Sequence, residues 1–166
     1  MGNNILLAVD NADDLTRTLT YVGETIGAHT GFTIYLFHVL SPMPPELLEF
    51  GGSENPNEEE TLTKKLREDQ SKWITQAKEA AQPLFEKAKA VLQQHHVSPQ
   101  KIHCEFSTSI HRPDVVRGLL EAAQNFQCGT IVVGRSSFPS FKEMFHAHIG
   151  EELVQKGQGF TIWVVE

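Results

Sequence analysis

Hydrophobic residues along the chain gather in five short runs, separated by longer stretches with helical periodicity. The runs span residues 4–10, 31–40, 101–106, 129–134 and 160–166. Most of them are almost continuously apolar and rich in β-branched and aromatic residues, which is typical of strands covered on both faces. In residues 101–106 apolar and polar positions alternate instead, so we expect this strand near an edge of the sheet.

The stretches between the runs carry apolar residues three or four positions apart, which is the spacing of an amphipathic helix. Such stripes occupy residues 15–26, 62–91, 116–123 and 141–153. Strands that alternate with helices predict right-handed crossovers, and therefore an open, doubly wound α/β fold with a parallel sheet and helices on both faces. A chain of 166 residues is most simply a single domain, here 1–166.

Polar residues, prolines and glycines predict where these helices begin, bend and end. Three pairs have the spacing of an N-terminal cap: Asn11 with Asp14, Asn57 with Glu60, and Ser140 with Glu143. Pro83 lies inside the second stripe and lacks an amide hydrogen, so we expect a kink or break near Ala81 and Gln82. Gly157 is expected to end the last helix.

The connection at residues 41–60 differs in composition from the rest of the chain. It holds six Glu, four Pro and two Gly but no Lys or Arg. This composition predicts an exposed acidic loop rather than regular structure. The sequence fits a loop that covers the domain and one that extends into solvent equally well.

Charge and composition narrow the possible partners. The net charge is −7 and Lys and Arg form no stripe, which argues against nucleic acid because phosphate contacts need clustered cations. No run reaches the roughly 18 apolar residues of a membrane span, and the N-terminus lacks a signal-peptide pattern, so we expect a cytoplasmic protein. Cys104 and Cys128 are expected to be reduced, buried thiols. The eight His lack the converging spacing of a metal site.

The fold class itself predicts where a ligand would bind. In doubly wound sheets, ligands lie beyond the carboxyl ends of the strands, where the winding direction reverses. If the first and fourth strands are neighbours, that crevice is bounded by residues 8–12 and 133–137. Asp10 could accept a hydrogen bond from a ribose hydroxyl or cap the following helix, and its two oxygens could divide these tasks. Trp73 and Trp163 are expected to pack rather than to bind a ligand.

Three segments of the chain, taken in order, resemble the universal stress protein family. They are residues 4–28, the Leu-Phe-His-Val-Leu of residues 36–40, and the closing region 129–166. The resemblance implies a five-stranded parallel sheet of order 3-2-1-4-5 and a dimer. It also points to a loop after the fourth strand, Gly-x2-Gly-x9-Gly-Ser/Thr, in which the nucleotide-binding members of the family resemble one another.

Carried over by position, only the first glycine of that loop is present, at Gly134. The second falls on Ser137, the third on Ala147 and the hydroxyl on His148. Glycine lets backbone N–H groups approach a phosphate closely and permits positive φ, so a Cβ at Ser137 or Ala147 restricts both. The resemblance therefore implies a degraded phosphate loop.

A cradle made of side chains is the alternative to a cradle made of backbone. Donors near Gly134 are carried by Arg135, Ser136, Ser137, Lys142, His146 and His148. Arginine binds phosphate with a forked pair of N–H groups, although the same cations suit an ordinary solvated surface. Phe138, Pro139 and Phe141 make the loop stiffer and more apolar, and would fill the space that a triphosphate occupies.

These interpretations define the candidate site and the expected function. The candidate nucleotide-binding residues are Ala8, Asp10, Val39, Gly134, Arg135, Ser136, Ser137, Ala147 and His148. We expect a stress-response or regulatory protein that acts by binding and dimerisation, without tight ATP binding and without catalysis. The alternative is a regulator that binds ATP or another adenine nucleotide; weak ATP hydrolysis would have only Asp10 as its base. The apolar strand at 160–166 is expected at an edge, where it would pair in a homodimer.

Overall fold

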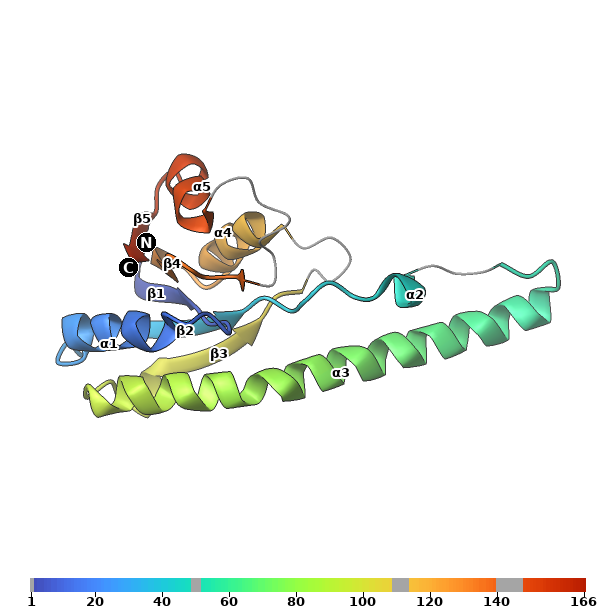
Figure 1. The fold of residues 1–166 in the computed structure, drawn as a ribbon, viewed down its shortest axis with the longest axis horizontal. Helices are drawn as coiled ribbons and strands as arrows, with labels where there is room; N and C mark the ends of the chain where they lie inside the picture. Colours follow the sequence, from blue (N-terminus) through green and yellow to red (C-terminus); the bar gives the residue numbers. More distant parts are fainter. Residues whose placement is uncertain (1, 49–51, 109–113, 140–147) are drawn as a thin grey trace.

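The computed structural model describes residues 2–48, 52–108, 114–139 and 148–166, and these contain a sheet of five parallel strands. The strands are β1 (Gly2–Ala8), β2 (Thr33–His38), β3 (Ile102–Phe106), β4 (Cys128–Gly134) and β5 (Thr161–Val165). Their order in space is β3-β2-β1-β4-β5, as the resemblance implies. The predicted fold class is thereby confirmed (Figure 1).

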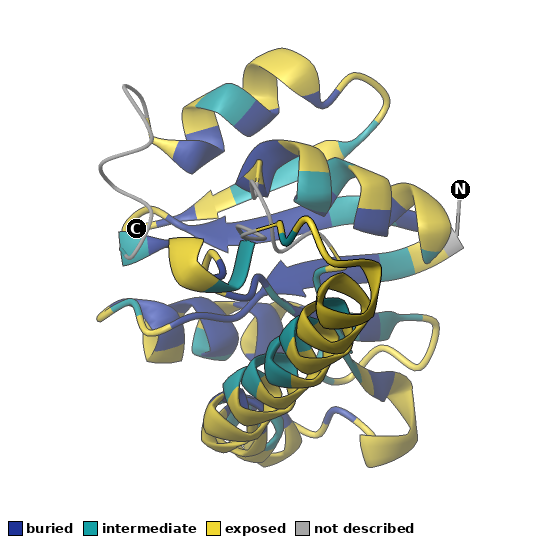
Figure 2. Cartoon of the chain, turned by 90° about the vertical axis from the view of Figure 1, so that its right-hand side faces the viewer, coloured by how far each residue is buried: buried dark blue, intermediate teal, exposed yellow. Residues whose placement is uncertain are grey.

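Helices cover both faces of this sheet. They are α1 (Leu15–Ile26), α2 (Pro45–Leu48), α3 (Pro56–Gln94), α4 (Val115–Asn125) and α5 (Ile149–Lys156), with a 3-10 turn at Pro99–Lys101. Figure 1 shows α1 and α3 on one side of the sheet and α4 and α5 on the other. The buried residues concentrate in the strands and on the inner faces of the helices (Figure 2). The layers are those of a doubly wound α/β protein.

The central strand β1 is apolar from Ile5 to Ala8 because these residues serve two cores. Ile5 and Leu7 belong to the core beneath α1 and α3, whereas Leu6 and Ala8 belong to the core beneath α4 and α5. Alternate side chains of a strand point to opposite faces, so a strand covered on both sides has no polar face. This explains why the run at 4–10 shows no alternation in sequence.

The two edges of the sheet are β3 and β5. The expected edge position of residues 101–106 is confirmed, and only Ile102 among the β3 residues is buried. Cys104 of β3 is half-buried and Cys128 of β4 is buried, and both are free thiols. Burial raises the pKa of the Cys128 thiol to about 11, so this group stays protonated and unreactive near neutral pH.

The second crossover is more helical than its sequence predicted. Helix α3 begins at Pro56 rather than near Asn57, and its cap is Asn55, whose side chain accepts a hydrogen bond from the Asn57 amide. Within the expected loop 41–60, residues 45–48 form α2. The Gln70 side chain of α3 donates a hydrogen bond to the Leu47 carbonyl at 2.6 Å, so α2 lies against α3.

Helix α3 continues through Pro83 without interruption to Gln94. Of the expected kink or break near Ala81 and Gln82, the break is therefore absent, and the kink stays a prediction. The buried residues of α3 lie on both sides of the proline: Ala81, Phe85, Ala88 and Leu92. Their packing on the sheet holds the helix together where one backbone hydrogen bond is missing. The N-terminal half of α3 extends well beyond the sheet (Figure 1). No helix in the described part of the chain is both long and apolar enough to span a bilayer.

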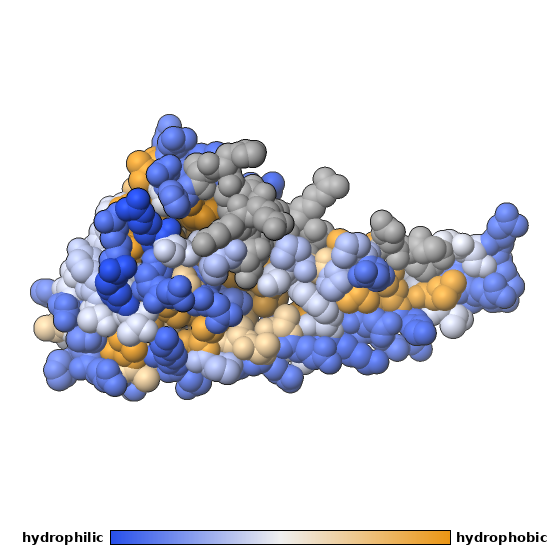
Figure 3. Space-filling model, in the orientation of Figure 1, coloured by the Kyte–Doolittle hydropathy of each residue, from blue (hydrophilic) through white to orange (hydrophobic). Residues whose placement is uncertain are grey.

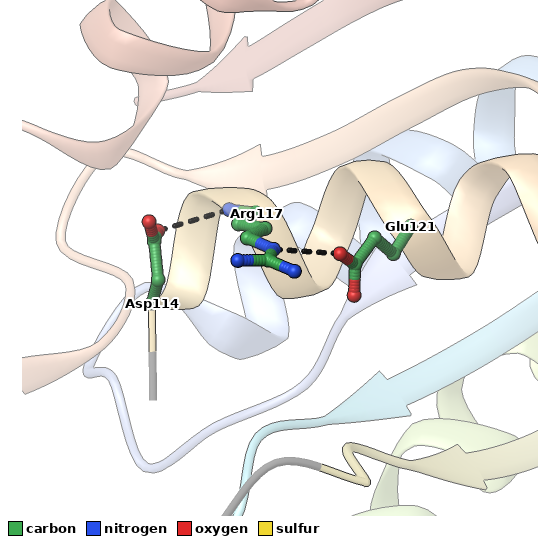
Figure 4. Close-up of polar contacts among 3 residues, drawn as sticks. All are labelled: Asp114, Arg117 and Glu121. Atoms are coloured by element: carbon green, nitrogen blue, oxygen red, sulfur yellow. Dashed lines mark hydrogen bonds and ion pairs between the residues drawn. The ribbon is translucent and has the colours of Figure 1, made fainter. Parts of the chain in front are cut away.

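Helices α4 and α5 begin with different caps. Asp114 precedes α4 and its Oδ1 accepts a hydrogen bond from the Arg117 amide at 3.0 Å, while the Arg117 side chain pairs with Glu121 (Figure 4). At α5 the expected cap, Ser140 with Glu143, lies outside the described residues. His148 occupies the cap position of α5 without a side-chain cap bond. Gly157 ends α5 as predicted.

We predict that Asp114→Ala lowers the free energy of unfolding by about 1 kcal/mol, the usual cost of removing an N-terminal cap. Urea denaturation followed by circular dichroism measures the change. Glu121→Gln is the matched control, because it removes only the exposed ion pair with Arg117 and should leave the midpoint unchanged. Equal effects of the two substitutions would contradict the role of Asp114 as a cap.

Candidate functional site

The carboxyl ends of β1 and β4 lie side by side and are joined by two carboxylates. The Phe138 amide donates a hydrogen bond to Asp10 Oδ2. The Ser136 amide donates to Asp14 Oδ2 at 2.8 Å. Asp10 and Asp14 follow β1, while Ser136 and Phe138 follow β4, so these bonds connect segments more than a hundred residues apart.

The remaining amides of this loop are also engaged within the protein. The Gly134 amide donates to Ser137 Oγ at 2.9 Å, and the Ser137 amide donates to the Gly134 carbonyl at 3.1 Å. The Arg135 amide donates to the Val165 carbonyl of β5 at 2.8 Å. Every backbone N–H from Gly134 to Phe138 therefore has an acceptor in the chain itself. A phosphate would have to displace these acceptors before it could use the same donors.

Asp10 is a buried carboxylate held from two directions. Its Oδ1 accepts a hydrogen bond from the Ala12 amide at 2.9 Å, and its Oδ2 accepts the one from Phe138. Desolvation by burial raises the pKa of Asp10, and the hydrogen bonds from Phe138 and Ala12 oppose that rise. Asp10 does not cap α1, whose N-cap position is held by Asp14. Its Oδ1 instead holds the turn before α1, and its Oδ2 bonds to the β4 loop.

Asp14 serves the β4 loop rather than the start of α1. It occupies the N-cap position of α1, but its side chain makes no cap hydrogen bond, so the predicted capping pair with Asn11 is wrong. Instead it lies against Gly134, where an added Cβ would stand 2.7 Å from Asp14 Oδ1. That oxygen is buried and has no hydrogen-bond partner among the described residues. Gly134 is therefore required by the close approach of a carboxylate.

Phe138 anchors the loop after β4 through its buried ring. Its φ is +63°, an uncommon conformation for a residue with a Cβ, and its side chain is 2% exposed. The ring packs in the core that contains Ala8, Val39 and Ile149. That Phe138 fills the space of a triphosphate stays a prediction; the structure shows its ring buried beside the loop.

A cleft of about 380 Å³ lies beyond the ends of β1 and β2. The ends of the two strands contribute Asp10, Asn11, His38, Val39, Leu40 and Ser41; α3 contributes Trp73, Gln76, Ala77, Ala80, Ala81 and Leu84; and the β4 loop contributes Phe138 and Pro139. Figure 3 shows an apolar patch in the region where α2 lies against α3. Helix α3 is thus one wall of the cleft, and the ends of the central strands are the other.

His38 has a defined tautomer in this cleft. Its Nδ1 lies 2.7 Å from the Val9 carbonyl, and because a carbonyl only accepts, Nδ1 is the nitrogen that carries the hydrogen. The ring makes edge contacts with Phe85 and Phe106, which fix its orientation. In the neutral ring, Nε2 is consequently an acceptor.

Among the residues singled out from the sequence, Asp10 and Val39 come together in the cleft. Ala8 is buried in the core beneath α4 and α5 and does not line the cleft. Arg135 is exposed and forms an ion pair with Glu166.

The other residues of the expected loop serve its internal structure. Ser136 contributes its amide and Ser137 its hydroxyl to the hydrogen bonds described above. His148 is exposed at the start of α5. Ala147, Lys142 and His146 lie outside the described residues.

Sequence reasoning missed three residues that shape this region: Asp14, His38 and Trp73. The sequence predicts a helix cap at Asp14 and a packing role for Trp73. The signal for Trp73 was its place in the apolar stripe of α3, followed at Ala77 and Ala81 by small residues that leave space beside the indole. Within the described ranges, no three His, Cys, Asp or Glu residues gather as metal ligands.

Comparison with known proteins agrees with this fold. The model of the Universal stress protein family matches residues 1–158, and none of the curated proteins matches the chain. A universal stress protein in complex with cAMP is 11% identical, with 98% of this chain and 96% of that chain covered and a TM-score of 0.61. Universal stress protein UspA from Lactobacillus plantarum is 16% identical, with coverages of 98% and 97% and a TM-score of 0.57.

A third solved structure is the universal stress protein from Archaeoglobus fulgidus in complex with dAMP. It is 14% identical to this chain, with 98% of this chain and 97% of that chain covered and a TM-score of 0.53. At these identities the likeness concerns the fold. The family model covers most of the chain, from the first strand to the end of α5.

We predict that Gly134→Ala destabilises the protein by about 1–3 kcal/mol, because the new methyl group would overlap the Asp14 carboxylate. Chemical denaturation measures the loss. Gly118→Ala in α4 is the matched control: nothing lies within 4 Å of its added Cβ, so it should stabilise the helix slightly. A neutral Gly134→Ala would show that Asp14 does not hold the loop closely.

Proposed function

Because this chain belongs to the universal stress protein family, we propose that it acts by reversible binding rather than by catalysis, as a stress-response or regulatory protein that does not bind ATP tightly. The observation behind this proposal is that the backbone amides of the loop after β4, from Gly134 to Phe138, are all bonded within the protein. We call this arrangement the closed loop. Asp10 and Asp14 accept hydrogen bonds from the Phe138 and Ser136 amides. A carboxylate in each position takes the place that a phosphate oxygen would need.

Charge adds to this argument. The triphosphate of ATP is strongly anionic, and two buried carboxylates beside the loop would repel it. Among the described residues that line the neighbouring cleft there is no Lys or Arg. A phosphate cradle commonly uses such cations, so the described part of this lining supplies no compensating charge.

The alternative is a regulator that binds an adenine nucleotide through a side-chain cradle. It is favoured by the cleft that Asp10 and Val39 share, and by relatives of the same fold that were solved with cAMP and dAMP. Under this alternative, Arg135 leaves its ion pair with Glu166 to hold phosphate, assisted by Ser136 and Ser137. The two proposals differ in what happens when Arg135 is removed.

We predict that isothermal titration calorimetry with Mg²⁺ and ATP detects no tight binding, and that no phosphate is released under excess ATP. The triple variant Ser137→Gly, Ala147→Gly, His148→Ser restores the family's loop pattern and should bind ATP at least about ten-fold more tightly, since glycine permits close approach of amides to phosphate.

Arg135→Ala serves as the comparison for this experiment. Tight ATP binding by the unmodified protein, weakened several-fold or more in Arg135→Ala, would overturn the closed-loop proposal and support the alternative.

We further propose that the chain forms a homodimer through β5. This strand is an edge of the sheet, and an unpaired edge exposes backbone donors and acceptors to another chain. Val164 of this strand is 42% exposed. Tyr21 of α1 is 48% exposed and makes an edge contact with Trp163 of β5. Antiparallel pairing of two β5 strands would give a symmetric interface that covers these side chains.

We predict that Val164→Lys shifts the protein from dimer to monomer in sedimentation equilibrium, because a charge on an edge strand opposes strand pairing. Val154→Lys is the matched control, since Val154 is an equally apolar and more exposed residue, on α5 rather than on the edge strand. If both variants remain dimeric, or if the unmodified protein is a monomer, the β5 interface is wrong.

A further inference from the structure

We propose that a pocket at the amino ends of β2 and β3 binds a small aromatic monocarboxylate. The pocket lies between the connection that leads from α1 to β2 and the connection that leads from α3 to β3. Because the strands are parallel, this is the end of the sheet opposite to the cleft beside Asp10. The site is separate from the loop after β4, so the inference goes beyond the proposed function and does not rest on it.

The C-terminal ends of α1 and α3 lie side by side at this end of the molecule (Figure 1). Gly27 follows α1 directly, and a Cβ added to it would overlap the carbonyl oxygen of His95, which follows α3. The glycine therefore permits the close approach of the two helix ends. As a result, the two connections that continue into β2 and β3 form the facing walls of one pocket.

The floor of the pocket is apolar and continuous with the core beneath α1 and α3. Ile26, Ile34 and Val97 are buried members of that core, and Phe32 packs against it. The pocket measures about 230 Å³, whereas an engineered cavity of roughly 150 Å³ is large enough to bind benzene. Phe32 also meets the ring of His29 edge to face, with 6.2 Å between the ring centroids, so it offers an aromatic surface to a ligand ring.

The rim of the pocket carries a positive charge and hydrogen-bond donors. Its exposed lining residues are Lys101, His29, Thr30, His96 and Ser98. Lys101 makes no ion pair with any residue in the described part of the chain. A carboxylate held by an ammonium group and by hydroxyl or imidazole donors forms charge-assisted hydrogen bonds. A cationic rim above an apolar floor selects a ligand with an apolar body and one negative group.

His96 occupies a position of the rim at which glycine is usual. Its φ is +68°, and its amide donates to the Gln93 carbonyl at 3.0 Å. The Val97 amide donates to the Leu92 carbonyl at 3.1 Å. These are the two hydrogen bonds of a Schellman motif at the end of a helix, where glycine commonly adopts the left-handed conformation. Histidine adopts it at a cost in stability, and it adds an imidazole to the rim of the pocket.

The test titrates the full, isotope-labelled chain with benzoate and follows its amide resonances by NMR. Benzoate should shift the resonances of residues 27–32 and 95–101, which form the two walls, and not those around Asp10. Benzyl alcohol has the ring without the charge, and inorganic phosphate has the charge without the ring. Each should bind roughly three-fold or more weakly than benzoate. Added salt should weaken the binding of benzoate but not of benzyl alcohol.

Lys101→Gln tests the charge of the rim. It should weaken benzoate binding roughly three- to ten-fold and leave benzyl alcohol binding unchanged, because it removes the positive charge and keeps a hydrogen-bond donor. Lys87→Gln is the matched control, since Lys87 is an exposed lysine of α3 that does not line the pocket. That variant should bind both compounds as the unmodified protein does.

His96→Gly moves two measured quantities in opposite directions. The urea midpoint should rise, because glycine adopts a positive φ without strain. Benzoate binding should weaken roughly two- to five-fold, because the imidazole donor is lost. A purely structural role of His96 would change the midpoint alone, and unchanged benzoate affinity would remove His96 from the site.

The inference is wrong if benzoate shifts no resonances in residues 27–32 and 95–101, or if Lys101→Gln and Lys87→Gln bind it equally well. Equal affinities for benzoate and benzyl alcohol would also overturn it, because the rim would then contribute nothing. Shifts confined to the surroundings of Asp10 would place benzoate in the other cleft and contradict the inference. None of these results bears on the closed loop, which the ATP titration tests separately.

Discussion

The region beyond the strands depends on two carboxylates that hold the β4 loop against the end of β1. Asp10 and Asp14 stand within five residues of each other, and each accepts a hydrogen bond from a backbone amide of the loop that follows the neighbouring strand β4. Burying two like charges so close together is unfavourable, and the charge of Asp14 is among the causes that raise the Asp10 pKa. Hydrogen bonds from backbone amides offset that cost, so loop and carboxylates stabilise one another.

The raised pKa of Asp10 gives this arrangement a pH dependence of known sign. The folded protein binds a proton at Asp10 more readily than the unfolded chain does. Stability from this group is therefore greatest below the unfolded pKa, and it decreases as pH rises from that value through the raised folded value. At neutral pH the burial of the charged Asp10 lowers the free energy of unfolding. The hydrogen bonds to its two oxygens make that decrease smaller.

The sequence predicted those features of the fold that depend on local residue patterns. Continuous apolar runs identified the buried strands, alternation at 101–106 identified an edge, and Gly157 identified the end of α5. The order of the strands came from the resemblance to a family.

By contrast, the bond between Asp14 and the Ser136 amide joins residues 122 positions apart, and no local signal distinguishes it from a helix cap. The true start of α3 was visible in Asn55 followed by Pro56, a cap followed by a favourable first helical residue. Trp73 could be placed in the cleft only once the path of α3 over β2 and β3 was known.

Helix α3 joins two environments in one continuous element. All of its buried residues lie from Ala81 onward, whereas the turns before them extend past the sheet (Figure 1). Pro83, which cannot donate a backbone hydrogen bond, stands near the boundary. The outer turns are held by intrinsic helix propensity and by contacts with α2, and the inner turns by the core. The backbone amides of α3 should thus exchange their hydrogens with solvent at very different rates, fast near the N-terminal end and slow in the buried turns from Ala81 onward. The wall of the cleft can therefore open locally while the sheet stays folded.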